Sequence, residues 1–388
     1  MTNDKSYDLL VIGGGIFGLW VAKWAVEKGM TVALAEKDKV GAGASGGLLG
    51  ALMPHIPTGW NEKKQFQFEA LSELSYIIQC LEDETGARTG YRRLGRAMPL
   101  RQKRFVDIAR QREEASRETW QQDSGTFDFR VCQDEAISDW LSKDRAAFGY
   151  VLDTLAARVN PRGYLEALRQ WLSTRATILE THEFDRFNNS VASFGGGKTS
   201  LKAGQVVLAL GYETFPHLVK THDLDIGSGV KGQSAIFQIG NTDGLPVIYD
   251  DGVYTVPHDN GMCAVGSTSE NSWTNPSEPD LANTEFIEKA VTLCPRLQGL
   301  EPVERWAGVR PKCHQREPII GRLMEDDPIY IATGGFKVSF GIAHRVSEWL
   351  VDEIMGEPSR VALPSTFTVE HHLSAVREKR VSKKRDFH

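Results

Sequence analysis

The first 36 residues carry the pattern that most constrains the fold of this chain: an apolar run, a glycine-rich turn, a helical segment and a second apolar run. The first run leads into Gly13, Gly15 and Gly18, and the second ends at Glu36. Gly13 permits a tight turn, Gly15 leaves space for a close approach to the backbone, and Gly18 lets the helix lie against the strand. An acidic residue after the second strand accepts hydrogen bonds from a ribose. Because all these parts fall in register, the pattern predicts a dinucleotide site at the helix N-terminus.

The composition is that of an ordinary globular protein with room for two domains. The chain has 388 residues, of which 41% are hydrophobic and 25% charged, and its net charge of −6 gives no overall attraction to nucleic acid or to an anionic membrane. No apolar run approaches the roughly 20 residues of a membrane span. No apolar leader precedes the first strand, so we expect no secretory signal and a cytoplasmic protein. The five cysteines are scattered and form no CxxC, so we expect neither a disulfide framework nor a metal site.

The rest of the chain mixes two kinds of strand with helices. Residues 206–211 and 329–335 are short apolar runs that end in glycine, which is typical of buried parallel strands. Residues 230–266 are broken by Asp-Gly and Asn-Gly pairs, which favour antiparallel strands. We therefore expect an α/β fold in which one domain is assembled from discontinuous pieces. Helices are expected over about residues 62–81, 101–121 and 342–355, and after the N-cap Asn160 with Pro161.

Several ordered motifs resemble one protein family. After the glycine turn come Gly43-Ala-Ser45, VVLALG at 206–211, VKGQ at 230–233, YTVP at 254–257, Trp306-Ala-Gly-Val-Arg-Pro311, Pro318-Ile-Ile-Gly321 and Ala332-Thr-Gly-Gly-Phe336. In this order they resemble the flavin-dependent amine and amino-acid oxidases, which include glycine oxidase, D-amino-acid oxidase and sarcosine oxidase. The residue chemistry agrees, because no Ser/His/Asp set, metal cluster or carboxylate pair stands out, and a flavin would itself accept the hydride.

The resemblance implies a two-domain fold. A Rossmann-like FAD-binding domain would comprise residues 1–55, 150–225 and 305–370. A substrate domain, built on a mixed and largely antiparallel sheet, would comprise residues 56–149 and 226–304. Residues 371–388 are expected to form a basic C-terminal tail.

The resemblance also implies FAD as a non-covalent cofactor. Sarcosine oxidases attach FAD through a cysteine shortly after the WAGVRP-type segment, but Cys313 lies too early for that position. The glycine turn and Glu36 would hold the ADP half, and Ala44 and Ser45 would contact the pyrophosphate and ribityl region. Val159 would lie at the adenine end. The full expected cofactor set is Gly13, Gly15, Ile16, Phe17, Gly18, Glu36, Lys37, Ala44, Ser45, Gly50, Ala51, Leu52, Val159, Ala209, Gly211, Arg310, Gly335, Phe336, Lys337, Val338 and Ser339.

Three residues are expected to act in catalysis. Arg310 matches the family's arginine for the substrate carboxylate, which a planar guanidinium can bind through two hydrogen bonds. Tyr254 matches a glycine oxidase tyrosine that assists this carboxylate, although an ordinary core tyrosine fits its position nearly as well. Lys337 would lie near the flavin, where a cation stabilises the anionic reduced form. The alternative for Lys337 is a lysine that extends into solvent.

The expected activity is oxidation of the C–N bond of an amino acid or secondary amine to an imine. Oxygen, a quinone or an electron carrier would accept the electrons, and a homo-oligomer is left open. The segment from Gly43 to Pro54 also resembles the oxidase domain of a bacterial enzyme that modifies tRNA wobble uridine. With the basic residues near the C-terminus, this keeps nucleic acid open as a partner. A flavoprotein subunit of a multi-subunit amine dehydrogenase is the third alternative.

Overall fold

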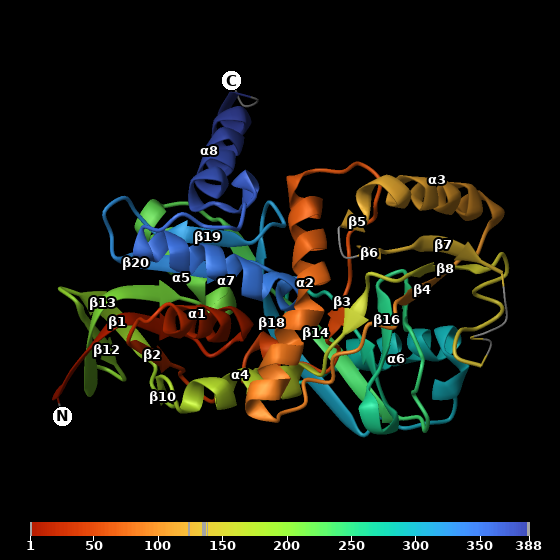
Figure 1. Ribbon diagram of the computed structural model, residues 1–388, viewed down its shortest axis with the longest axis horizontal. Helices are drawn as coiled ribbons and strands as arrows, with labels where there is room; N and C mark the ends of the chain where they lie inside the picture. The colour runs from red at the N-terminus through yellow and green to blue at the C-terminus, as the bar shows by residue number, and fades with distance from the viewer. Residues whose placement is uncertain (1, 123–124, 134–136, 138, 386–388) are drawn as a thin grey trace. The chain divides into compact units, whose positions relative to one another are not determined.

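The computed structural model describes residues 2–122, 125–133, 137 and 139–385 of the chain (Figure 1). The chain folds into two compact units: unit 1 comprises Met1–Gly46, Leu165–Val230 and Val309–His388, and unit 2 comprises Gly47–Tyr164 and Lys231–Gly308. These boundaries differ from the expected ones. Residues 47–55 and 150–164 belong to unit 2, because Ala51–Leu52 (β3) pairs with Ala157–Arg158 (β9). Which unit binds cofactor and which binds substrate stays a prediction.

Unit 1 is built on a sheet with a parallel centre. Its order is β10-β2-β1-β13-β12-β11, and β20 adds to β13 and carries β19. The strands β10, β2, β1, β13 and β20 run parallel, whereas β11, β12 and β19 pair antiparallel with their neighbours. The bounds are β1 Thr2–Ile12, β2 Val32–Ala35, β10 Thr177–Leu179, β11 Phe184–Asn188, β12 Val191–Phe194, β13 Thr199–Leu208, β19 Ile319–Arg322 and β20 Ile329–Thr333.

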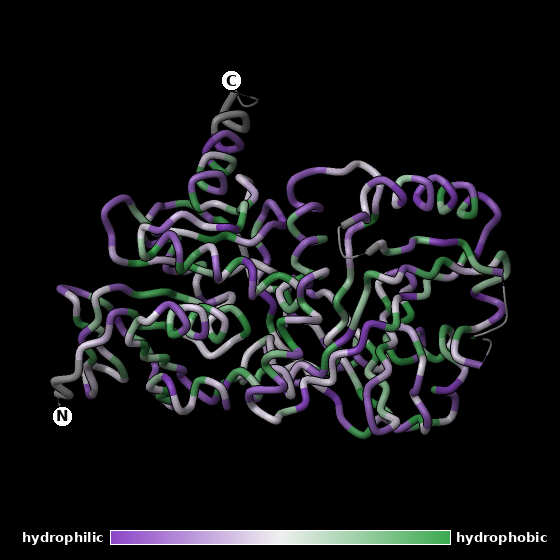
Figure 2. Tube along the Cα trace, viewed as in Figure 1, coloured by the Kyte–Doolittle hydropathy of each residue, from purple (hydrophilic) through white to green (hydrophobic). Residues whose placement is uncertain are grey.

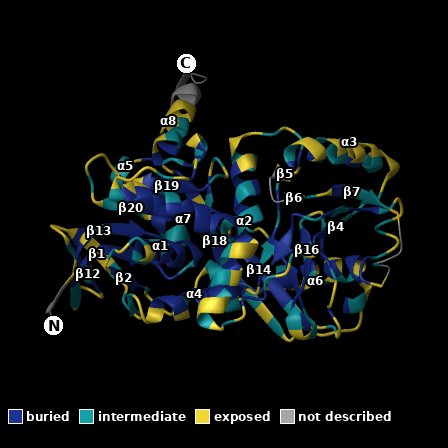
Figure 3. Cartoon of the chain, viewed as in Figure 1, coloured by how far each residue is buried: buried dark blue, intermediate teal, exposed yellow. Residues whose placement is uncertain are grey.

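Helices cover this sheet and bury its apolar strands. Helix α1 (Ile16–Glu27) packs against α7 (Ser339–Met355), and the two lie side by side in Figure 1. Figure 3 shows α7 and the central strands as buried, and Figure 2 shows the strands as predominantly hydrophobic. This is the burial that continuous apolar runs predict for a parallel sheet. The other helices in this unit are α5 (Thr214–His222) and α8 (Val369–Arg385), and α4 (Pro161–Ser173) begins in unit 2 and ends here.

The segment expected as a basic tail is a helix through the described residues. Helix α8 packs against β19, and its Val369 and Leu373 belong to the hydrophobic core of unit 1. The ring Nε2 of His372 forms a 2.9 Å hydrogen bond to the Pro318 carbonyl oxygen. Residues 371–385 are therefore part of the folded unit. Residues 386–388 and the side chains of residues 381–385 lie outside the described residues.

Unit 2 is organised around a second sheet, which is largely antiparallel as expected. Its strand order is β18-β14-β17-β16-β15-β4-β8-β7, and β15 pairs with β4 in parallel. The segments Gly227–Val230 of β14 and Val309–Cys313 of β18 belong to unit 1. Helix α6 packs on β16 and β17. The bounds are β4 Arg96–Pro99, β5 Gln121–Gln122, β6 Gly125–Thr126, β7 Phe129–Cys132, β8 Tyr150–Asp153, β14 Gly227–Gln238, β15 Val247–Asp250, β16 Val253–Pro257, β17 Met262–Gly266, β18 Glu304–Cys313, α2 Glu62–Thr85, α3 Lys103–Thr119 and α6 Leu281–Leu293.

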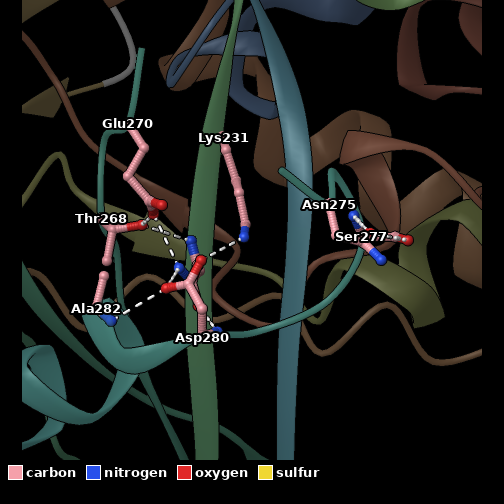
Figure 4. Close-up of polar contacts among 8 residues, drawn as sticks. Lys231, Thr268, Glu270, Asn275, Ser277, Asp280 and Ala282 are labelled. Carbon is pink, nitrogen blue, oxygen red and sulfur yellow. Dashed lines mark hydrogen bonds and ion pairs between the residues drawn. The ribbon is translucent and has the colours of Figure 1, made fainter. Parts of the chain in front are cut away.

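A buried lysine ties β14 to the start of α6 within unit 2 (Figure 4). Lys231 is 1% exposed, and its Nζ lies 2.7 Å from Asp280 Oδ2. Asp280 is also the N-cap of α6, where its Oδ1 accepts a hydrogen bond from the Ala282 amide. Gln233 Nε2 donates to the carboxylates of Asp280 and Glu270. Each polar group of this network has a partner, so the network stabilises the fold of unit 2.

Candidate active site

The carboxyl ends of the parallel strands in unit 1 bring part of the expected cofactor residues together at one edge. Ile12 is in register with Ala35 and with Leu208, and Leu208 is in register with Ile331. The strands are followed by the glycine turn (residues 13–15), Glu36, Ala209 and the Gly334–Gly335 pair. Ligands of open α/β sheets bind outside this edge of the strands. The fold therefore brings together segments that are far apart in the sequence.

Two of the three motif glycines are required by the protein's own packing. Gly13 has a φ of +110°, and a Cβ there would lie 2.8 Å from the Ala209 carbonyl carbon. A Cβ on Gly18 would overlap the Gly13 carbonyl oxygen, because α1 lies directly against the end of β1. Neither position can hold a side chain without a shift of the backbone. These contacts confirm the expected turn and the close packing of helix on strand.

Gly15 is different, because the chain itself leaves space around it. Its φ is −82°, which any residue can adopt, and a Cβ there would meet only the Ser45 hydroxyl at 3.3 Å. Ser45 Oγ accepts a 3.1 Å hydrogen bond from the Ile16 amide, which places Ser45 at the N-terminus of α1. The first amides of a helix lack intrahelical acceptors and attract anions. A glycine that internal packing does not require therefore fits a group that approaches from outside the chain.

The Glu36 carboxylate is held close to the glycine turn. Its Oε2 accepts a 2.7 Å hydrogen bond from the Gly14 amide, and its Oε1 accepts a 3.0 Å hydrogen bond from the Asp38 amide. A carboxylate has about four acceptor sites, so acceptor capacity remains for the hydroxyls of a ribose. Lys37 points elsewhere within unit 1, where it forms an ion pair with Glu213.

The segment after β20 lies against the start of α1. A Cβ on Gly335 would lie 2.8 Å from the Phe17 ring, so glycine is needed for this contact. Phe336 follows with a φ of +45°, and the Val338 amide donates a 2.9 Å hydrogen bond to the Gly335 carbonyl. Helix α7 then begins at Ser339. Two helix N-termini, those of α1 and α7, thus adjoin the same short segment.

Three cations surround the ring of Phe336. Arg310 Cζ lies 5.5 Å from the ring centroid, Lys312 Nζ 5.8 Å and Lys337 Nζ 5.7 Å. Burial, followed by the nearby Arg310 charge, lowers the pKa of Lys337 to about 8, although the residue as a whole is exposed. The sequence predicted Arg310 and Lys337 but missed Lys312. The feature that could have identified Lys312 is its spacing of two residues from Arg310 on one strand, which puts both side chains on the same face.

The other predicted residues lie in different places. Ala209 and Gly211 follow β13, and the Thr333 hydroxyl donates to the Gly211 carbonyl at 2.6 Å. Tyr254 lies in unit 2 on β16, where its ring packs against the Tyr249 ring at a tilt of 40°, with the ring centroids 4.6 Å apart. Gly50, Ala51, Leu52 and Val159 also lie in unit 2, and the Val159 amide donates to the Gly50 carbonyl at 2.9 Å. The cofactor roles of these four, and the catalytic role of Tyr254, stay predictions.

Cys313 is not placed for a covalent link to a cofactor. It is 0% exposed within the core of unit 1, and a Cβ on Gly334 would lie about 2.5 Å from its Sγ. Burial raises the pKa of its thiol well above the ordinary value, which leaves the thiol inert. Among the described residues no group of His, Cys, Asp and Glu could hold a metal ion, and no described helix is long and apolar enough to cross a membrane.

A parallel sheet whose carboxyl edge carries this glycine turn and a fixed acidic residue defines a dinucleotide-binding protein. The chain belongs to the family of FAD dependent oxidoreductases (DAO), whose sequence profile matches residues 8–349. This confirms the family, the fold class and FAD as the cofactor. The open space at Gly15 and the spare acceptor sites of Glu36 fit the phosphates and a ribose of FAD. The buried Cys313 agrees with non-covalent binding.

Known relatives support the same assignment. The chain is 26% identical to a glycine oxidase from Bacillus licheniformis, over 94% of this chain and 98% of that protein. The structure of glycine oxidase from Geobacillus kaustophilus is similar to it with a TM-score of 0.82 and 19% identity, over 94% of this chain and 98% of the other. Iminodiacetate oxidase from Chelativorans sp. BNC1 is similar with a TM-score of 0.79 and 20% identity, over 93% and 98%. At these identities the two structures show the fold alone.

Proposed function

We propose that this enzyme oxidises the C–N bond of an amino acid, or of an N-substituted amino acid, to an imine that water then hydrolyses. The observation that carries the proposal is Arg310 beside Phe336, on the segment that contacts Phe17 in the same unit as the glycine turn. A permanent cation at this place suits a substrate with a carboxylate. The similarity to glycine oxidases over nearly the whole chain supports the same substrate class.

The chain's residues would orient the substrate and supply electrostatic stabilisation. Arg310 would hold the carboxylate through two parallel hydrogen bonds, which fixes the position of the neighbouring C–H. FAD, when bound, supplies the two-electron acceptor for the hydride. Lys337 and the N-terminus of α7 would favour negative charge on the reduced cofactor, because both present positive charge to the same segment. Tyr254 would assist the carboxylate as a hydrogen-bond donor.

The acceptor that reoxidises FAD is proposed to be oxygen, a quinone or an electron carrier. The reaction removes a hydride from carbon and a proton from nitrogen, and the acceptor takes up both electrons.

The proposal is tested by mixing the purified holoenzyme, without oxygen, with glycine, sarcosine, D-amino acids, iminodiacetate, simple amines and tRNA. We expect flavin absorbance to fall only with the small amines that carry a carboxylate, and a 2-oxo acid to accumulate when an acceptor is added. Reduction by carboxymethylaminomethyl-modified tRNA alone would replace the proposal with the tRNA alternative. Reduction by no member of the panel would contradict amine oxidation.

A further inference from the structure

Lys312 is a cation that the proposed reaction does not use. It lies on β18 two residues after Arg310, and its Nζ is 5.8 Å from the centroid of the Phe336 ring that Arg310 also contacts. A strand repeats its faces every two residues, so the two side chains lie roughly 7 Å apart on one face. Lys312 therefore belongs to the same cluster as the arginine that would hold the substrate carboxylate.

Besides Arg310, the cluster contains the positive charges of Lys312 and Lys337. Within the part of the chain that the structure describes, neither Lys312 nor Lys337 forms an ion pair with a carboxylate. Like charges that gather in one place repel, and a bound anion relieves this repulsion. Burial and, after it, the nearby Arg310 charge lower the pKa of Lys337, so Arg310 and Lys337 repel each other.

We propose that the substrate carries a second negatively charged group, and that Lys312 selects for it. This inference rests on the proposed function, since it assigns the first carboxylate to Arg310. Amines with two carboxylates, of which iminodiacetate is the simplest secondary amine, are the class that matches. The distance between Arg310 and Lys312 along the strand suits two separate carboxylates on one small molecule.

Two ligands that lack the amine nitrogen test this selection apart from turnover. Oxydiacetate has two carboxylates, and methoxyacetate is its analogue with one. Their dissociation constants follow from the change in the visible flavin spectrum of the holoenzyme. We expect the wild type to bind oxydiacetate more tightly than methoxyacetate. Lys312→Met should weaken the binding of oxydiacetate by about tenfold and leave the affinity for methoxyacetate nearly unchanged.

Two further variants control for charge and folding. Lys312→Arg keeps the cation and should keep the preference for oxydiacetate. Lys220→Met removes an equal charge from an exposed position on α5 and should change neither constant. Flavin content and the melting temperature of each variant report whether it is folded.

The inference is overturned if the wild type binds both analogues with equal affinity, or if Lys312→Met changes the affinity for both analogues to the same extent. Either result leaves the proposed oxidation of amino acids intact, because neither analogue is oxidised. Absence of flavin reduction by every amine would instead overturn the proposed function, whatever the two ligands do.

Discussion

Replacing Gly15 by alanine should weaken FAD binding and leave the fold of the apoprotein intact. The added Cβ would meet only the Ser45 hydroxyl at 3.3 Å, and the φ of −82° suits alanine. We expect the free energy of unfolding of the apoprotein to change by less than about 1 kcal/mol. The methyl group would stand between α1 and the phosphates, which costs one or two hydrogen bonds to a charged group, at about 1.5–3 kcal/mol each. FAD affinity should therefore fall by about tenfold or more.

Gly18→Ala is the matched control for this prediction. Its Cβ would overlap the Gly13 carbonyl oxygen, so α1 would have to move away from β1. We expect this variant to lose stability even without FAD, by several kcal/mol. The assay is FAD titration of the apoproteins by quenching of flavin fluorescence, with thermal unfolding of each apoprotein alongside. Unchanged FAD affinity in Gly15→Ala, or equal destabilisation of the two apoproteins, would refute the reasoning.

Three further predictions concern charges. Asp280→Asn keeps the N-cap acceptor of α6 but leaves the buried Lys231 without its counterion. Urea unfolding should show a free energy of unfolding that is lower by about 2–3 kcal/mol, which is less than the full cost of a broken buried pair because Asp280 is half exposed. Burial lowers the pKa of His258 from 6.5 to about 4, so the unfolded chain gains the proton first as pH falls. The free energy of unfolding should therefore drop by up to about 3 kcal/mol between pH 6.5 and pH 4. His258→Gln should flatten this part of the curve of stability against pH. The pKa of Lys337 is about 8, so affinity for sulfite should fall as pH rises through that value, and Lys337→Met should remove this pH dependence without releasing FAD.

Features set by neighbouring residues could be predicted from the sequence. The glycine turn and its βαβ unit depend on a few adjacent positions, and each part has a local steric reason. The N-cap Asn160 is confirmed for the same reason, since its Oδ1 accepts a 2.9 Å hydrogen bond from the Gly163 amide. The parallel strands were recognisable because burial on both faces requires continuous apolar runs.

Features that depend on distant packing could not be predicted. Lys312 joins the cation cluster only because the segment after β20 brings Phe336 to β18. The basic residues near the C-terminus suggested a tail, but Val369 and Leu373 bury their side chains in unit 1 and extend the fold as α8. Short apolar positions within a charged segment give little signal until the surface that receives them is known.

The central claim is tested most directly by the rate of flavin reduction without oxygen in the wild type, Arg310→Ala and Arg310→Lys. The substrates are sarcosine and dimethylamine, which differ by one carboxylate. We expect the second-order rate constant for sarcosine to fall by roughly two orders of magnitude or more in Arg310→Ala, because a partly buried charge partner is lost. Arg310→Lys should recover only part of this loss, since a lysine cannot form the paired hydrogen bonds. The account would be contradicted if dimethylamine reduced the wild-type flavin faster than sarcosine does. It would also be contradicted if the rate constant for sarcosine were unchanged in Arg310→Ala.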